Sequence, residues 1–242
     1  MGQNTKQEAL RLASAAANVA FFQLRRPGPE IVIEDTIIHG ASALRRRVDL
    51  PWLIAGSLTI GAGKPDLLLV SYNPQILTAS RLESHDEVVL GYLKTVSRAR
   101  FETIRERTGR TSGQLERQLD QYVDVGAVFE KSGVFRLTPC WRNILPEVIS
   151  VEAKVSNWRK AMHQAGRNRL FAHESFVALP ETVALRTDTG AALREMGIGL
   201  LSICAKEVDI VHSARRRQPV IWYYYYRLAL TVARHLGGEI GL

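Results

Sequence analysis

The sequence predicts an α/β protein, and three observations lead to this class. Runs rich in Val, Ile and Leu at 31–39 and 63–70 are typical of strands. Strand-like and helix-like segments alternate again in 140–242. Between these parts, residues 84–139 have the helical periodicity of a separate unit. We therefore expect a mixed central sheet flanked by helices, formed by residues 1–80 and 140–242, with residues 84–139 inserted as a second domain.

The N-terminal part is expected to contain one helix and two strands. Residues 4–24 carry apolar side chains at helical spacing, and the segment "RRPGPE" ends this helix. The β-branched run "IVIEDTIIH" at 31–39 is a predicted strand. A Gly/Pro turn precedes a second predicted strand, "GKPDLLLV" at 63–70, and residues 72–84 then form a connection.

The inserted segment begins with two predicted helices. The first covers 84–96, with Ser84 as its N-cap and Glu87 as the second member of a capping box. The second covers 99–109 and ends at Gly109, a residue type that commonly terminates helices.

A third helix and a hairpin complete the inserted segment. The helix starts at a Thr/Ser cap and places Leu115, Leu119 and Val123 on its inner face. The hairpin that follows turns at Ser132 and Gly133. Three helices and a two-stranded hairpin in about 55 residues resemble a winged helix-turn-helix domain, which implies contact with DNA through the third helix and the hairpin. Many such domains instead bind other proteins, and this alternative remains open.

The resemblance predicts which side chains face DNA. Side chains that can hydrogen-bond base edges or phosphates are expected to point outward from the third helix, basic residues precede it, and two more lie on the hairpin. These residues are Arg107, Arg110, Gln114, Arg117, Gln118, Gln121, Lys131 and Arg136.

The C-terminal part resumes the alternation. The segments in order are a strand at 148–155, a helix at 156–173 capped by Ser156, a strand at 175–180, a helical segment at 181–197, two strands about a turn near Ala205 and Lys206, and a final helix at 222–238.

The strand at 148–155 carries two opposite charges on one face. Glu152 and Lys154 are two positions apart, and strand side chains alternate between faces. Burying such charges costs several kcal/mol unless a partner compensates. An ion pair is one form of compensation. A metal ion is another, because Mg2+ prefers a few carboxylate oxygens together with water.

The residues around this pair resemble the PD-(D/E)xK nuclease superfamily. Pro65-Asp66 is similar to the PD element, and Glu152-Ala153-Lys154 is similar to ExK. The resemblance implies a restriction-endonuclease-like core of helix, three strands, helix and strand, and a phosphodiesterase that uses Mg2+ or Mn2+. It also implies that Asp66 and Glu152 are metal ligands and that Lys154 lies beside the attacking water.

Two further residues are implied by the same resemblance. Gln164 lies in the helix after ExK, and the superfamily often takes another acid from its first helix, for which Glu8 is the candidate. Each of these residues also has an explanation without a catalytic role, and these explanations stay open. Asp66 can cap a turn, Glu152 and Lys154 can form an exposed pair on an edge strand, and Gln164 can be solvated.

Charge and composition narrow the class of partner. A net charge of +8 favours polyanions, with DNA as the leading partner. No apolar run is long enough for a membrane span and no secretory signal is recognisable, so we expect no membrane partner and a cytoplasmic location. The chain has no Walker-type phosphate loop, no GxGxxG motif and no nucleophile elbow, which argues against nucleotide hydrolysis.

The leading hypothesis is a DNA-binding endonuclease that hydrolyses phosphodiester bonds of duplex DNA with Mg2+ or Mn2+. Cutting both strands with one active site per chain would favour a homodimer. One alternative is a catalytically inactive DNA-binding or regulatory protein that keeps the nuclease fold. Another is a protein-interaction module that serves assembly.

Overall fold

The computed structural model describes residues 19–25, 27–61, 63–82, 87–205 and 207–238. The chain divides into two compact units. The first, here called the sheet unit, contains the described residues up to Ser71 together with Glu147–Gln218. The second, called the helical unit, contains Tyr72–Pro146 and the described residues from Pro219 onward. The helical unit is therefore larger than the predicted insertion at 84–139 and includes the C-terminal helix.

The sheet unit is built on a seven-stranded mixed sheet with the order β1-β2-β3-β7-β8-β9-β10. Strands β2, β3 and β7 are antiparallel neighbours, whereas β7, β8 and β9 run parallel. Strand β1 is parallel to β2, and β10 is antiparallel to β9. The bounds are β1 Val19–Phe21, β2 Trp52–Gly56, β3 Leu67–Ser71, β7 Glu147–Ala153, β8 Glu174–Pro180, β9 Gly199–Cys204 and β10 Glu207–His212.

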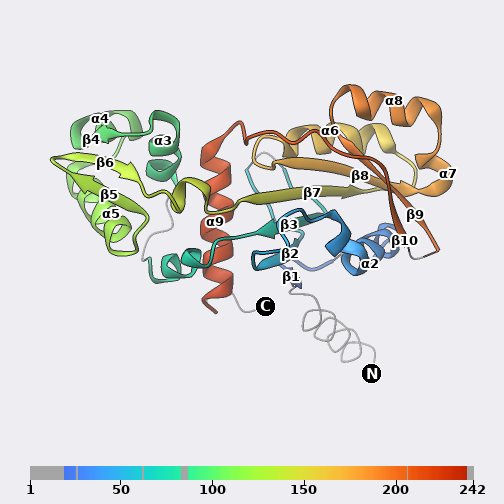
Figure 1. Ribbon diagram of the computed structural model, residues 1–242, viewed down its shortest axis with the longest axis horizontal. Coiled ribbons are helices and arrows are strands. Elements are labelled where there is room, and N and C mark those ends of the chain that lie inside the picture. The colour runs from blue at the N-terminus through green and yellow to red at the C-terminus, as the bar shows by residue number, and fades with distance from the viewer. Residues whose placement is uncertain (1–18, 26, 62, 83–86, 206, 239–242) are drawn as a thin grey trace. The chain divides into compact units, whose positions relative to one another are not determined.

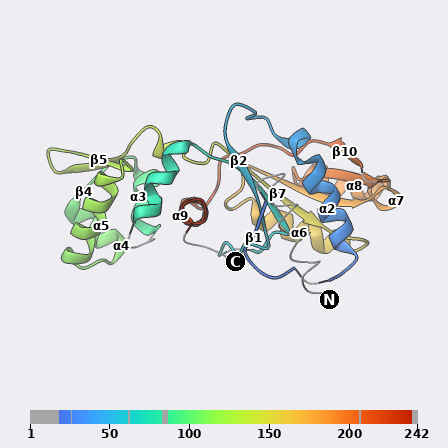
Figure 2. The same ribbon diagram turned by 90° about the horizontal axis from the view of Figure 1, so that it is seen from below.

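Helices cover both faces of this sheet (Figures 1 and 2). Helix α2 (Glu30–Gly40) packs Ile33 and Ile37 against the face that carries Val151 and Ala153. Helices α6 (Trp158–Asn168), α7 (Glu181–Ala184) and α8 (Thr187–Glu195) cover the opposite face. Because the central strands are buried from both sides, β3 and β7 are buried along their whole length. The short 3-10 segment η1 (Ala41–Leu44) follows α2.

The helical unit combines helices with a small antiparallel sheet of order β4-β6-β5. Its buried side chains include Leu93, Ile104, Leu115, Leu119 and Leu137. The elements are η2 Pro74–Arg81, α3 Val88–Val96, β4 Ala99–Arg100, α4 Phe101–Thr108, α5 Ser112–Asp124, β5 Val128–Lys131, β6 Val134–Leu137, η3 Trp141–Asn143 and α9 Trp222–Leu236.

The prediction for residues 31–39 is wrong, because this segment is helix α2. Its β-branched residues lower helix propensity only weakly, and burial of Ile33, Thr36 and Ile37 along one face of the helix outweighs that preference. Pro29 and Glu30 at its start are helix-initiation signals.

The predicted helix at 4–24 is also wrong at its end. Residues 19–21 form strand β1, and residues 4–18 lie outside the described residues. Strand β2 at 52–56 was not predicted, and it supplies the neighbour that joins β1 to the rest of the sheet.

Several predicted helix ends and turns are confirmed. Gly109 ends α4 in the left-handed region with φ of 67°, and Thr111 caps α5 as predicted. Thr111 also forms a capping box with Gln114 that was not predicted. Ser132 and Gly133 form the hairpin turn, both with positive φ. Two caps differ from prediction. Asn157, rather than Ser156, caps α6, and α3 follows Glu87 without a side-chain cap, while Ser84 lies outside the described residues. No helix in the described part of the chain is long and apolar enough to cross a membrane.

Candidate active site

Asp66 and Glu152 come together at one end of two neighbouring strands. Leu67 pairs with Val151 between β3 and β7. One further step along this antiparallel register places Asp66 opposite Glu152, although the two residues are 86 positions apart in the sequence. The segment that separates them contains most of the helical unit.

Glu152 is a buried carboxyl group with incomplete hydrogen bonding. Its side chain faces α6, where Asn168 Nδ2 donates to Glu152 Oε1 at 2.7 Å. Its second oxygen, Oε2, is buried and has no partner among the described residues. Burial and then the nearby charge of Asp66 raise the pKa of Glu152 to about 8. A cation at this position would offset both effects.

Asp66 is held by the strand that carries Glu152. Asp66 Oδ2 accepts hydrogen bonds from the backbone N–H of Ala153 at 2.8 Å and from Lys154 Nζ at 3.1 Å. Lys154 Nζ also donates to the Ala153 carbonyl at 2.6 Å. The side chains of Asp66 and Lys154 are 25% and 16% exposed, so this ion pair lies at the mouth of the site and not in its interior.

A cleft of about 320 Å³ opens onto Asp66 and Lys154. Lys64 lies on the same cleft. From the other side, α2 contributes Glu34. The cleft therefore combines acidic and basic groups around Asp66, an arrangement suited to a phosphate ester that needs charge neutralisation.

Glu34 is the acid that sequence reasoning missed. Its carboxylate forms an ion pair with Arg25 at 2.9 Å. The pKa of Glu34 is raised, mainly by burial, while Arg25 lowers it and the negative charge of Asp66 raises it further. Glu8, the residue proposed from the sequence, lies outside the described residues. Recognising α2 as a helix would have offered Glu34 as a candidate, because the resemblance takes the further acid from a helix that precedes the strands of the core.

Gln164 lies one turn before Asn168 on α6 and is half-buried. Its amide oxygen, Oε1, is buried without a partner among the described residues. Glu152 and Gln164 thus each present an oxygen that lacks a donor. Hydrogen-bond acceptors left in this state are rare in folded proteins, and a bound cation is one explanation for them.

These residues fit a divalent cation of the Mg2+ type. Within the part of the chain that the structure describes, no group of three or more His, Cys, Asp or Glu side chains is arranged to hold a metal ion. Mg2+ nevertheless needs only one or two protein carboxylates, since waters and substrate phosphates complete its octahedron. Asp66 and Glu152 supply that number, and the oxygen without a partner on Glu152 is the observation that favours this group.

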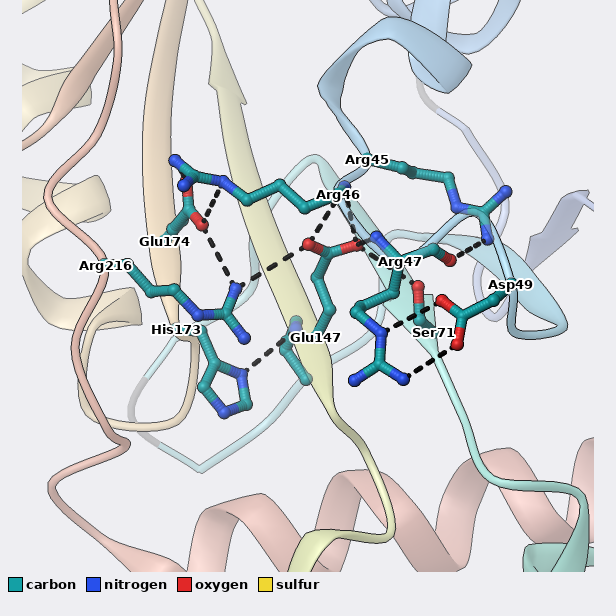
Figure 3. A network of polar contacts seen from close by, with 10 residues as sticks. Arg45, Arg46, Arg47, Asp49, Ser71, Glu147, His173, Glu174 and Arg216 are labelled. Carbon is teal, nitrogen blue, oxygen red and sulfur yellow. Dashed lines mark hydrogen bonds and ion pairs between the residues drawn. The ribbon is translucent and has the colours of Figure 1, made fainter.

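A second polar network lies at the other ends of β7 and β8 (Figure 3). Glu147 and Glu174, the first residues of these strands, are both almost fully buried. Arg216 bridges the two carboxylates at 3.6 and 3.2 Å, and Arg46 contacts Glu174 at 3.3 Å. The backbone N–H of Arg46 and the hydroxyl of Ser71 also donate to Glu147.

This network explains part of the basic composition in structural terms. Arg47 pairs with Asp49 at 2.9 Å, and the Arg45 guanidinium lies over the Trp52 ring at 4.3 Å. Together with Arg46 and Arg216, these arginines hold the segment after η1 against the strand ends. The charge clusters at 45–47 and 215–217 are therefore partly neutralised by structural ion pairs.

Most of the residues predicted to contact DNA are accessible in the helical unit. Arg107, Gln114, Arg117, Lys131 and Arg136 are exposed, and Arg110 and Gln121 are half-buried. Gln114 also has a local role, because its Oε1 accepts the backbone N–H of Thr111 in the capping box.

Gln118 does not point outward as predicted. It is only 7% exposed, and its Nε2 donates to the hydroxyl of the buried Tyr122 at 3.2 Å. Val123, predicted to face inward, is 41% exposed. The buried stripe of α5 follows Leu115, Gln118, Leu119 and Tyr122 because helix positions three and four apart share a face, whereas repeated steps of four drift around the helix.

Comparisons with protein families, with characterised proteins and with solved structures find no match to this chain.

Proposed function

We propose that this protein is a DNA-binding nuclease that hydrolyses phosphodiester bonds with Mg2+ or Mn2+. The observation that carries the proposal is the register-opposed pair of Asp66 and Glu152, in which Glu152 keeps one buried oxygen without a partner. Two carboxylates, one on β7 and one immediately before β3, with a lysine 3.1 Å from Asp66, supply the groups that metal-assisted hydrolysis requires.

The order of the elements supports the same proposal. Helix α2, strands β2, β3 and β7, helix α6 and strand β8 follow one another as helix, three strands, helix and strand. This order agrees with the core that the resemblance to PD-(D/E)xK nucleases implies, and it supports the proposal. The large gap between the PD and ExK elements corresponds to the segment in which most of the helical unit lies.

The helical unit supports a role in binding duplex DNA. Its order of α3, β4, α4, α5, β5 and β6, with a sheet in the order β4-β6-β5, resembles that of a winged helix and supports this part of the proposal. In such domains the third helix enters the major groove and the hairpin contacts the backbone. Here these elements are α5, with exposed Arg117, and the β5–β6 hairpin, with exposed Lys131 and Arg136.

Each residue of the candidate active site has a distinct proposed role. Asp66 and Glu152 would hold the divalent cation, which supplies Lewis-acid activation of water and charge neutralisation when it is bound. Lys154, at the mouth of the cleft, orients the attacking water and stabilises the negative charge that builds on the phosphate. Asn168 and the Ala153 N–H orient the two carboxylates.

The proposal is tested by cleavage of duplex DNA in Mg2+ or Mn2+ and in EDTA. The variants Asp66→Asn and Lys154→Met are expected to lose at least 100-fold in cleavage rate, on the order of the loss when one transition-state donor is removed, and to retain DNA affinity. Asp188→Asn on the exposed surface of α8 and Lys160→Met on α6 are matched controls that keep full activity. Cleavage that persists in Asp66→Asn, or that occurs equally in EDTA, would contradict the proposal.

A second candidate is a nuclease fold that binds DNA without cutting it. The specific observation in its favour is that Asp66 Oδ2 is already engaged by Lys154 and by the Ala153 N–H. In that case the wild-type protein binds duplex DNA in low salt but leaves duplex, branched and single-stranded substrates intact with either metal. The absence of any DNA binding at low salt, where phosphate contacts are strongest, would leave the protein-assembly alternative.

A further inference from the structure

The helical unit contains a cavity of about 620 Å³ that lies outside the candidate active site. It is formed at the small sheet, where the end of α3, strands β5 and β6 and the segment after β6 meet. Its exposed wall is mainly apolar, from side chains such as Leu137 and Pro139. The volume is within the range of pockets that bind small organic ligands.

An aromatic side chain and an arginine form one wall of this cavity. Phe129 on β5 and Arg136 on β6 are cross-strand partners, and the Arg136 guanidinium lies over the Phe129 ring at 4.8 Å. Phe129 is 42% exposed, whereas its neighbour Val128 points into the core. Phe129 therefore contributes little to the core, and its ring and the planar guanidinium above it are surfaces on which a nucleobase stacks.

Two more arginines line the same cavity. Arg98 precedes β4 and Arg142 lies in η3. Within the described residues, neither these two nor Arg136 forms an ion pair with a carboxylate. This differs from Arg46 and Arg216 of the sheet unit, whose charges are neutralised by buried glutamates. The cavity thus combines apolar side chains with three arginines that have no carboxylate partner in the described part of the chain.

We propose that this cavity binds one nucleotide unit, with the base stacked against Phe129 and Arg136 and the phosphate held by Arg98 and Arg142. Apolar walls and a stacking surface favour a flat ring. A guanidinium group can donate two parallel hydrogen bonds to two oxygens of one phosphate. A purely apolar ligand would leave the arginines without a partner. A bare anion such as inorganic phosphate would leave the stacking surface empty.

The nucleotide unit can come from two sources. It can be a free nucleotide that acts as an effector, or an unpaired nucleotide of a DNA strand held beside the hairpin. The second source rests on the proposed DNA-binding function, whereas the first does not. Binding is therefore measured without metal and also in the Lys154→Met variant, so that failure of this site and failure of the nuclease proposal are distinguishable.

The experiment is titration calorimetry of the full chain in EDTA with dAMP, with deoxyadenosine, with inorganic phosphate and with an eight-nucleotide single-stranded oligonucleotide. We expect dAMP or the oligonucleotide to bind and the other two ligands to bind at least tenfold more weakly. If dAMP binds, a free nucleotide is sufficient to occupy the cavity. Binding of the oligonucleotide alone identifies an unpaired nucleotide of a strand.

Variants locate this binding in the cavity. Phe129→Leu and Arg142→Gln are each expected to weaken it about tenfold, in line with the loss of one stacked base or one phosphate contact. Arg81→Gln, an exposed arginine of the same unit away from the cavity, is the matched control and binds as the wild type does. Circular dichroism verifies that each variant is folded. Absence of binding by both ligands, equal binding of deoxyadenosine, or unchanged binding in both cavity variants would overturn the proposal.

Discussion

Replacement of Glu152 by Gln is expected to make the apo protein more stable, by an amount that depends on pH. The pKa of Glu152 is raised from its ordinary 4.5 to about 8, chiefly by burial and then by Asp66. Below about pH 4.5 the carboxyl is protonated in both the folded and the unfolded chain. Between pH 4.5 and 8 only the unfolded chain releases this proton, so the free energy of unfolding falls by about 1.4 kcal/mol per pH unit.

At pH 8 and above, ionisation of Glu152 lowers the free energy of unfolding of the wild type by about 3 to 5 kcal/mol relative to pH 4.5. The Gln side chain has no charge to bury, and its amide oxygen can still accept the hydrogen bond from Asn168. Its amide hydrogens can also donate toward Asp66. The Gln variant is therefore expected to match the wild type near pH 4.5 and to exceed its stability progressively as the pH rises.

Urea unfolding in EDTA at half-unit steps from pH 4.5 to 8.5 measures this difference. Glu195→Gln, at an exposed position of α8, is the control and should show no pH-dependent difference from wild type. Addition of Mg2+ at pH 8 is expected to stabilise the wild type and not Glu152→Gln, since a cation that binds only the folded state raises its stability. Parallel stability curves for wild type and Glu152→Gln, or a less stable Gln variant at pH 8, would refute the reasoning.

Three further changes test other parts of the structure. Gly63→Ala places a Cβ 2.8 Å from Asn168 Oδ1, so the Asn168 amide must move. Urea unfolding should show that the free energy of unfolding falls by about 1 kcal/mol. Unchanged stability would contradict the close approach of Gly63 and Asn168. Tyr225→Phe removes a buried hydroxyl that bonds both the N–H and the carbonyl of Leu145, and thermal unfolding should show a loss of about 1–3 kcal/mol. Burial, and then a nearby arginine, lower the pKa of Lys94 to about 8; its contribution to stability should therefore rise from pH 8 to 10, and an NMR titration that gives an ordinary lysine pKa would contradict this.

Local sequence patterns predicted the parts of the site that lie within single elements. Alternation along an extended chain predicts that Glu152 lies on a strand, and it lies on β7. Lys154, predicted on the same strand, follows the end of β7 at Ala153, and Asp66, predicted inside a strand at 63–70, lies immediately before β3. The proximity of Asp66 to Glu152 followed only from resemblance, because strand pairing across 86 residues has no local signal. Glu34 was missed because α2 is rich in β-branched residues, and burial against the sheet outweighs their propensity.

On α5 of the helical unit, local sequence patterns predict the start of the helix but not the whole of its buried face. A Thr/Ser cap predicts its start, because the Thr111 side chain accepts the backbone N–H of Gln114 only three positions away. Its buried face was predicted incorrectly at Gln118, since a polar side chain enters a core only when a partner is present. That partner is the hydroxyl of Tyr122 one turn later, itself buried by the surrounding packing.

Local sequence patterns are enough to predict the α/β class, most strands and helices of the second half of the chain, and the basic charge. In the inserted segment they also predict the end of α4, the cap of α5 and the hairpin turn. These properties depend on side-chain periodicity and on contacts within a few residues. Tertiary structure alone decided that residues 30–40 are helical, that Glu34 lies beside Asp66, and that Arg46 and Arg216 neutralise buried glutamates. It also decided that Phe129, Arg98 and Arg142 line one cavity. For the helix, the site and the glutamates, the deciding energy is burial or charge interaction between residues distant in the chain, which no local window contains.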